Sequence, residues 1–256
     1  MKKRARHVKH KLKNLELTLG SWITLGHPAI AEIMANAGFD WLAVDLEHSV
    51  ITIKEAEELI RVIDLAGSVP LVRLTANNSN QIKRVMDAGA AGIIVPMVKT
   101  VDDALQAIEA VRYPTNGSRG FGLARAQGYG NAFTEYLNWE STGPIVILQI
   151  EHKEAVENLE AILQLDGVDG FIVGPYDLSG SMGIPGHFDH PEFLRSISRI
   201  KSVAQDLKVA AGIHVVEPNI DDLKQRIQES FTFVAYSIDI RILDTGFRQA
   251  IDLIRS

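Results

Sequence analysis

Cysteine is absent from this 256-residue chain, which excludes disulfides, thiolate metal sites and cysteine nucleophiles. Long apolar runs are also missing: none approaches membrane-spanning length, and the first residues lack the apolar core of a signal peptide. Basic residues are fewer than acidic ones, which gives the chain a net charge of −6. A chain of this charge has little attraction for a nucleic acid. Together these absences predict a cytoplasmic protein without a membrane or nucleic-acid partner.

What positive charge there is gathers at the start of the chain. Residues 1–13 contain seven Lys and Arg and no acid, so the rest of the chain carries a net charge of −13. We expect residues 1–13 to form a solvated, frayed basic tail, with a targeting or polyanion-binding arm as the alternative. The chain is 46% apolar, enough for a sizeable core, and residues 14–256 have the length of a single α/β barrel domain.

Short apolar runs rich in β-branched residues alternate with helical segments. The run IVILQI and the block VDGFIV, joined by a helical stretch, have the pattern of a parallel βαβ unit. The predicted strands span residues 18–24, 41–47, 71–74, 92–98, 145–150, 168–173, 209–214 and 231–236. The predicted helices span residues 28–37, 53–66, 79–88, 101–111, 152–165, 192–206, 220–229 and 240–254. This alternation predicts an α/β fold of the (β/α)8 or TIM-barrel class, with a doubly wound open sheet as the alternative.

Two connections are longer than such folds usually need, at residues 113–143 and 180–191. The first holds five glycines between Gly117 and Gly130. Long glycine-rich loops often form the lids or walls of a site, so we expect both to border one. A tolerated surface insertion is the alternative.

Polar side chains stand where the predicted strands end, which is where a barrel of this class carries its catalytic groups. Gln149 and Glu151 are two residues apart and so project to the same side of their strand, and Asp177 follows the next strand. Two carboxylates at adjacent strand ends suit a hard divalent cation, although either one alone can simply cap a helix. The full set at the strand ends is Trp22, Asp45, Glu47, His48, Arg73, Met97, Gln149, Glu151, Asp177, His214 and Asp239.

That combination of a base, a fixed cation and two carboxylates predicts a site for a small oxygen-rich anion on a metal, with His48 moving a proton. The competing chemistry is a Schiff base, which needs a desolvated lysine on an inward strand position. The predicted strands supply none, and Lys99, just past the fourth strand, is the nearest candidate. We interpret it as a surface residue.

Several motifs together closely resemble the HpcH/HpaI aldolases, metal-dependent class II pyruvate aldolases such as 4-hydroxy-2-oxoheptanedioate aldolase and 2-dehydro-3-deoxyglucarate aldolase. The resemblance runs in register from about Leu19 to the C-terminus. The segments that carry it are GSWITLGHP around Trp22, VDLEH ending at His48, Arg73, VPM ending at Met97, Arg119-Gly120, QIE at 149–151 and GPYDLS at 174–179.

The resemblance implies a barrel of the phosphoenolpyruvate/pyruvate type, assembled as a homohexamer (a trimer of dimers) with the last helix exchanged between subunits. It also implies site roles. Glu151 and Asp177 resemble the metal ligands, for Mg²⁺, Mn²⁺ or Co²⁺. Arg73 resembles the residue that stabilises the enolate, and His48 the base, paired with Asp87 of a neighbouring subunit. Asp45 is expected to join the catalytic set, and the substrate is expected to contact Trp22, Gln149, Gly174, Pro175, Tyr176 and His214.

The sequence departs from that family pattern at three places. Tyr176 stands where a small residue is common, His214 replaces an apolar residue, and the segment 119–131 is shortened and carries Arg125 in a different setting. These places are expected to wall the side of the second substrate, whose identity therefore stays open.

The expected function is reversible cleavage of a 4-hydroxy-2-oxo acid to pyruvate and an aldehyde, through a pyruvate enolate. Two alternatives remain. One is a synthase of the same family that joins an oxo acid to an acyl-CoA, as in citrate formation. The other is a non-catalytic protein that binds 2-oxo acids.

Overall fold

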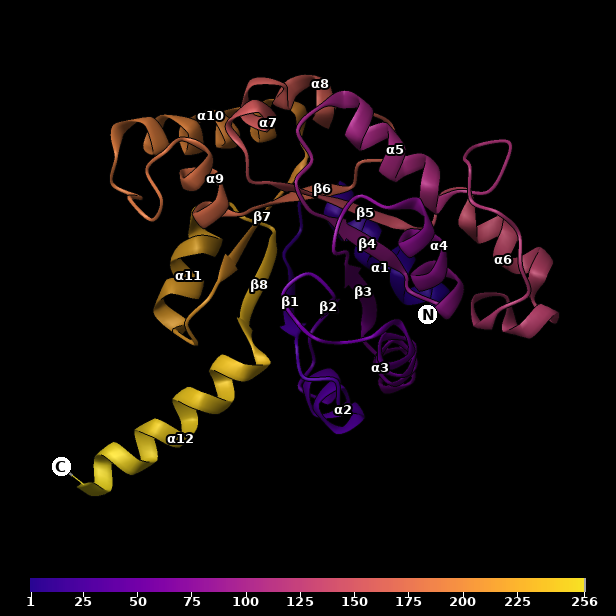
Figure 1. The fold of residues 1–256 in the computed structure, drawn as a ribbon, viewed down its shortest axis with the longest axis horizontal. Helices are drawn as coiled ribbons and strands as arrows, with labels where there is room; N and C mark the ends of the chain where they lie inside the picture. The colour runs from indigo at the N-terminus through magenta and orange to yellow at the C-terminus, as the bar shows by residue number, and fades with distance from the viewer. Residues whose placement is uncertain (256) are drawn as a thin grey trace.

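The computed structural model describes residues 1–255, and within them eight parallel strands close into a barrel in chain order (Figure 1). The predicted TIM barrel is therefore confirmed, and the open sheet is excluded. The strands are β1 (Thr18–Ile23), β2 (Trp41–Asp45), β3 (Val69–Arg73), β4 (Gly92–Val95), β5 (Ile145–Ile150), β6 (Gly170–Val173), β7 (Ala210–Val215) and β8 (Phe233–Ile238).

Helices follow the strands and cover the barrel. They are α1 (Lys2–Lys13), α2 (Pro28–Asn36), α3 (Ile53–Ala66), α4 (Ser79–Ala88), α5 (Val101–Val111), the 3-10 helix η1 (Arg125–Gly130), α6 (Phe133–Glu140), α7 (Lys153–Glu157), α8 (Leu159–Leu163), α9 (Pro175–Ser181), α10 (Pro191–Leu207), α11 (Ile220–Gln228) and α12 (Asp239–Arg255). Capping boxes explain why two helices begin where they do. Thr52 and Glu55 cap α3, and Thr100 and Asp103 cap α5, each pair satisfying backbone N–H groups of the first turn.

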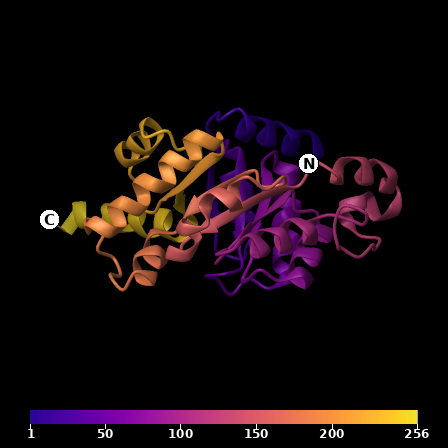
Figure 2. The ribbon, with the colours of Figure 1, turned by 90° about the horizontal axis from the view of Figure 1, so that it is seen from above.

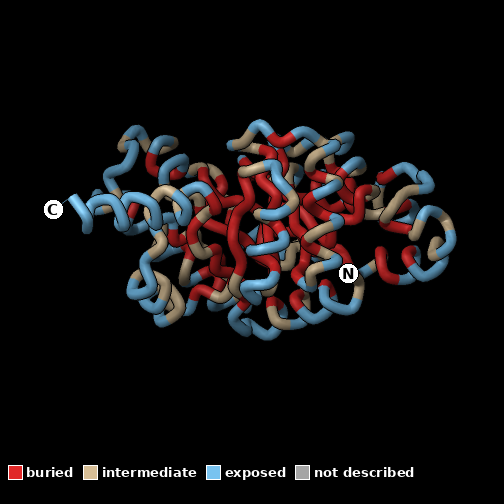
Figure 3. Tube along the Cα trace, turned by 90° about the horizontal axis from the view of Figure 1, so that it is seen from below, coloured by how far each residue is buried: buried red, intermediate tan, exposed pale blue. Residues whose placement is uncertain are grey.

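The core has two layers. One lies between the strands and the surrounding helices, and the other fills the barrel itself, where Trp41 stacks on Phe233 with ring centroids 4.2 Å apart. Gly20 makes room for this stack, because a Cβ there would lie 2.1 Å from the Trp41 ring. Figure 3 shows the buried barrel at the centre of the molecule. The barrel is thus a filled core, and only the strand ends remain for chemistry.

The expectation of a frayed basic start is wrong. Residues 2–13 form α1, which lies against the barrel along one edge of the molecule (Figure 2). Ala5, Val8 and Leu12 are buried, and they lie on one helical face at spacings of three and four. Lys9 binds Asp169 just before β6, and Lys11 binds Asp40 just before β2, each at 2.8–2.9 Å. The positive charges therefore hold α1 across the amino ends of the strands.

The two long connections lie at opposite ends of the barrel. Residues 113–143 join α5 to β5, and Arg125 ties them to Asp64 at 2.8 Å, near the end of α3. Residues 113–143 thus lie at the amino ends of the strands. The prediction that they border a site at the carboxyl ends of the strands of the same chain is wrong. The reason is that they follow a helix and not a strand. Residues 180–191 follow α9 on the carboxyl side, as expected.

The last helix, α12, departs from the barrel instead of packing along it (Figure 1). Asp239 is its one buried residue among those described, and Figure 3 shows the rest of the helix largely exposed. Its exposed side chains include Ile240, Ile242, Leu243 and Phe247. No helix within residues 1–255 combines the length and the apolar character needed to cross a bilayer.

Candidate active site

Arg73 and Asp45 form the fixed pair at the end of β3 and β2. Asp45 is fully buried and pairs with Arg73 in register, accepting from its Nε at 2.8 Å and its Nη2 at 2.5 Å. The Oδ1 atom of Asp45 also accepts from the backbone N–H groups of Glu47 and His48. The guanidinium lies over the ring of Trp22, 4.4 Å from its centroid. Asp45 therefore holds Arg73 in place and shapes the turn after β2, and this makes it a positioning residue.

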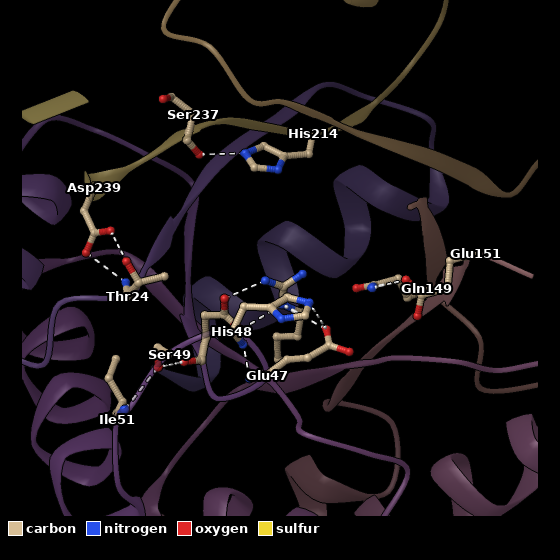
Figure 4. A network of polar contacts seen from close by, with 12 residues as sticks. Thr24, Glu47, His48, Ser49, Ile51, Gln149, Glu151, His214, Ser237 and Asp239 are labelled. Carbon is tan, nitrogen blue, oxygen red and sulfur yellow. Dashed lines mark hydrogen bonds and ion pairs between the residues drawn. The ribbon is translucent and has the colours of Figure 1, made fainter. Parts of the chain in front are cut away.

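Glu47 and His48 follow on that turn and face the mouth of the barrel (Figure 4). The His48 side chain is 66% exposed, and its Nε2 lies 3.8 Å from Glu47 Oε2. Glu47 Oε2 also lies 3.4 Å from Arg73 Nε, yet it is buried without a hydrogen-bond partner among the described residues. Burial raises the pKa of Glu47, against the lowering effect of Arg73. The sequence placed Glu47 at a strand end without giving it a role, and the structure brings it into the site.

Glu151 is the buried carboxylate on the opposite wall of the mouth, next to Gln149 (Figure 4). Its Oε1 accepts from the backbone N–H of Met97 at 2.6 Å, and its Oε2 accepts from Gln149 Nε2. Met97 reaches this position through a left-handed backbone conformation, with φ of 54°. Gly174 must lack a side chain, because a Cβ there would lie 2.7 Å from Glu151 Oε2. The carboxylate is thus held rigidly at the junction of β4, β5 and β6.

Three carboxylates influence one another at this end of the barrel. Burial, with a smaller contribution from the negative charges of Glu47 and Asp177, raises the pKa of Glu151 to about 6, against the lowering effect of the hydrogen bonds from Gln149 and Met97. Within residues 1–255, no three His, Asp or Glu side chains gather closely enough to enclose an ion by themselves. A hard divalent cation would nevertheless offset the repulsion between this buried carboxylate and its two neighbours. Waters and substrate oxygens would complete the coordination shell of the cation. The residues present therefore fit such a cation.

The turn GPYD carries the remaining predicted binding residues. Gly174 precedes α9 without a side-chain cap, and Pro175 occupies the first helical turn, so the following backbone N–H groups lack a side-chain acceptor. Asp177 lies in the same turn and is exposed. The Tyr176 ring packs edge-on against Phe188 of the 180–191 connection, with centroids 5.0 Å apart. The 180–191 connection therefore packs against Tyr176 at the carboxyl end of the barrel.

His214 extends the site on β7. Its Nε2 lies 3.0 Å from the carbonyl oxygen of Ser237, and its ring meets the ring of Trp22 edge-on with centroids 5.7 Å apart. Burial, together with the charge of Arg73, lowers the pKa of His214 to about 4. The imidazole is therefore neutral near pH 7.

Asp87 is not brought to His48 of the same chain. It ends α4 at the amino end of the barrel, and burial raises the pKa of its carboxyl against the opposing charge of Arg119. Arg119 is buried there, with its guanidinium 4.1 Å from the ring centroid of Tyr113. Lys99 lies two residues before α5, where its backbone N–H donates to Asp103. Asp87 and Lys99 therefore stand outside the cluster at the mouth.

Comparisons with known proteins give a consistent result. The profile of the HpcH/HpaI aldolase/citrate lyase family matches residues 18–244. A 2-keto-3-deoxy-L-rhamnonate aldolase of Escherichia coli is 34% identical over 254 residues, covering 97% of this chain and 92% of that protein. A crystal structure of an HpcH/HpaI aldolase/citrate lyase family protein from Burkholderia cenocepacia superposes with a TM-score of 0.92, at 32% identity, covering 98% and 99% of the two chains. The citrate synthase SbnG superposes with a TM-score of 0.84, at 25% identity and 97% coverage of both chains.

Proposed function

Because the chain belongs to the HpcH/HpaI aldolase/citrate lyase family and is a carbon–carbon lyase of the aldolase type, we propose that it reversibly cleaves a 4-hydroxy-2-oxo acid to pyruvate and an aldehyde. A divalent cation, Mg²⁺, Mn²⁺ or Co²⁺, would be held by Glu151 and Asp177. The observation that carries this proposal is the buried Glu151, whose pKa is raised by burial and by two neighbouring carboxylates. The E. coli relative, named for a 2-keto-3-deoxy sugar acid, supports the same substrate class.

When bound, the cation supplies Lewis-acid polarisation of the 2-oxo group and makes an enolate accessible. The chain's own residues do the rest. Arg73, aimed by Asp45, offers its remaining N–H groups to the oxygen that becomes negative during the reaction. The uncapped N–H groups at the start of α9 suit the pyruvate carboxylate. His48 is exposed at the mouth, where it can move the proton of the 4-hydroxyl group through water.

The active site of the proposed enzyme is shared between subunits, with Asp87 of one chain orienting His48 of its neighbour. Two features support this arrangement. Asp87 lies at the far end of the barrel from its own His48, and the Asp87 Oδ1 atom is buried without a hydrogen-bond partner among residues 1–255. The apolar side chains exposed on α12 support exchange of that helix within a hexamer built as a trimer of dimers. A cytoplasmic location, in line with the lack of cysteine, completes the proposal.

Exchange of the methyl protons of pyruvate with deuterated solvent tests the proposal without the second substrate. We expect NMR to show exchange in the presence of Mg²⁺ or Mn²⁺, and its loss with a chelator or in Asp177→Ala. Binding of pyruvate with no exchange under any metal condition would favour a non-catalytic binding protein. Full exchange in excess chelator would revive Schiff-base chemistry at Lys99.

A second candidate is a synthase that joins an oxo acid to an acyl-CoA. The similarity to the citrate synthase SbnG favours it. Release of free thiol from acetyl-CoA in the presence of oxaloacetate would support the synthase, whereas condensation of pyruvate with an aldehyde and no thiol release supports the aldolase.

A further inference from the structure

The ring of His214 is held in one orientation by the backbone of β8. Its Nε2 lies 3.0 Å from the Ser237 carbonyl oxygen, which can only accept, so Nε2 must carry the hydrogen. The edge contact with Trp22 fixes the plane of the ring from the other side. Because the imidazole is neutral, the remaining nitrogen, Nδ1, has a lone pair and no hydrogen.

A β-bulge directs the Ser237 carbonyl to this place. Along β1 and β8, Gly20 pairs with Ala235 and Trp22 pairs with Ile238, so β8 has one residue more than β1 over this interval. Ser237 is fully buried and adopts a left-handed conformation, with φ of 50°. Its Oγ donates to the Val216 carbonyl at 3.0 Å, which secures the bulge. The fold thus carries a specific device that holds the imidazole with Nε2 engaged.

The other nitrogen of the ring is left for a ligand. Within residues 1–255, His214 Nδ1 accepts no hydrogen bond, and the ring is only partly buried. In Figure 4, His214 and the pair Glu151 and Gln149 come from different strands around the site, and the second nitrogen of the His214 ring points away from Ser237 toward the middle of the view. The ring also lies beside the Trp22 ring on which the Arg73 guanidinium rests. His214 and Arg73 thus contact the same Trp22 ring, and the positive charge of Arg73, the residue assigned to the reacting oxygen, acts on the imidazole.

We propose that His214 Nδ1 accepts a hydrogen bond from a hydroxyl group of the aldehyde substrate, so that the enzyme selects 2-hydroxyaldehydes. This role rests on the aldol reaction proposed above, in which the aldehyde carbon reacts beside Arg73. A hydroxyl on the next carbon can donate to Nδ1. An aldehyde that ends in a carboxylate has no hydrogen to offer and would bring a negative charge against the lone pair. A hydrocarbon chain would displace water from Nδ1 without offering a donor in its place, and so would leave Nδ1 unpaired.

Two matched pairs of aldehydes test the inference: lactaldehyde against propanal, and glycolaldehyde against acetaldehyde. Each pair differs by one hydroxyl group. We expect wild-type kcat/KM for condensation with pyruvate to favour the hydroxylated member by about tenfold or more, the size of one well-placed hydrogen bond. In His214→Leu the preference should fall by about that factor. His214→Asn, whose side-chain oxygen can take the place of Nδ1, should keep part of it. Comparing wild-type and variant ratios cancels the intrinsic reactivities of the aldehydes.

Proton exchange of pyruvate separates this inference from the proposed function. If wild type does not exchange the methyl protons, the aldolase proposal itself fails. If wild type exchanges the methyl protons but His214→Leu keeps the full hydroxyl preference in kcat/KM, the role of His214 is refuted. A readout on the unaltered enzyme guards against a variant that does not fold. Nitrogen NMR of the ring must show an unprotonated Nδ1 at pH 7, and a protonated Nδ1 would overturn the proposal.

Discussion

Replacing Glu151 by Gln should stabilise the cation-free protein while abolishing its activity. The carboxyl oxygens of Glu151 accept from Met97 and Gln149, and a Gln side chain can keep the first contact while Gln149 rotates its amide to keep the second. The variant therefore lacks the negative charge of Glu151 but keeps the size and the hydrogen bonds of its side chain. Raising the pKa of Glu151 from 4.5 to about 6 corresponds to about 2 kcal/mol of unfavourable free energy for the ionised form.

The sign of the pH dependence follows from this shift. The folded protein binds the proton of Glu151 more tightly than the unfolded chain does, so its stability falls as pH rises from below 4.5 to above about 6. At pH 8 without metal, Glu151→Gln should therefore melt about 4–8 °C above wild type. At pH 4.5 the difference should largely disappear. Thermal unfolding of both proteins in chelator at pH 8 and pH 4.5 measures this difference in melting temperature. Because the two proteins share every other titrating group, the comparison isolates the contribution of Glu151.

Metal titration supplies the complementary result. A cation binds the ionised carboxylate, so the apparent dissociation constant of wild type should rise about tenfold between pH 8 and pH 5. Glu151→Gln should show no metal-dependent exchange of pyruvate protons at any pH. Equal melting temperatures for variant and wild type at pH 8, or exchange retained in the variant, would refute the assignment of Glu151 as a strained metal ligand.

Three further outcomes are expected from the same site. His48→Ala should slow aldol cleavage by about two to four orders of magnitude while pyruvate binding survives, and an unchanged rate in steady-state kinetics would make His48 structural. Arg73→Lys keeps the charge but loses the paired contacts to Asp45, so kcat should fall by about a hundredfold, whereas a rise in KM alone would mean that Arg73 binds only the ground state. Asp87→Asn and His48→Ala, each nearly inactive, should regain part of the activity when co-assembled, and no recovery in verified mixed oligomers would count against a shared site.

Local signals explain where the sequence predicted the fold well. The bounds of α3, α4 and α5 were predicted to the residue, because each has a side-chain N-cap and the first two end at a glycine in a left-handed conformation. The predicted helix at 152–165 is divided at Asn158 into α7 and α8. Residues 1–13 were wrongly predicted to be frayed because the prediction considered their positive charge and overlooked the apolar stripe of Ala5, Val8 and Leu12. Charged side chains along a helix do not prevent its opposite face from packing.

The site was foreseen at the level of strand ends but not at the level of contacts. Gln149, Glu151 and Arg73 lie at the same end of the barrel because its strands are parallel, and a sequence reveals this once the strands are known. The burial of Asp45, the unpaired oxygen of Glu47 and the bulge at Ser237 depend on how side chains pack, and no local pattern specifies them. The tautomer of His214 follows from one such contact.

Helix α1 has a consequence for engineering this enzyme. It closes the amino end of the barrel through buried apolar side chains and through the pairs Lys9–Asp169 and Lys11–Asp40. Those contacts lie at the opposite end from the mouth, so a mutant library that randomises rim positions such as Tyr176 and His214 leaves them intact. Selections for new aldehyde substrates can therefore vary the rim residues without altering the contacts that hold α1 to the amino end of the barrel.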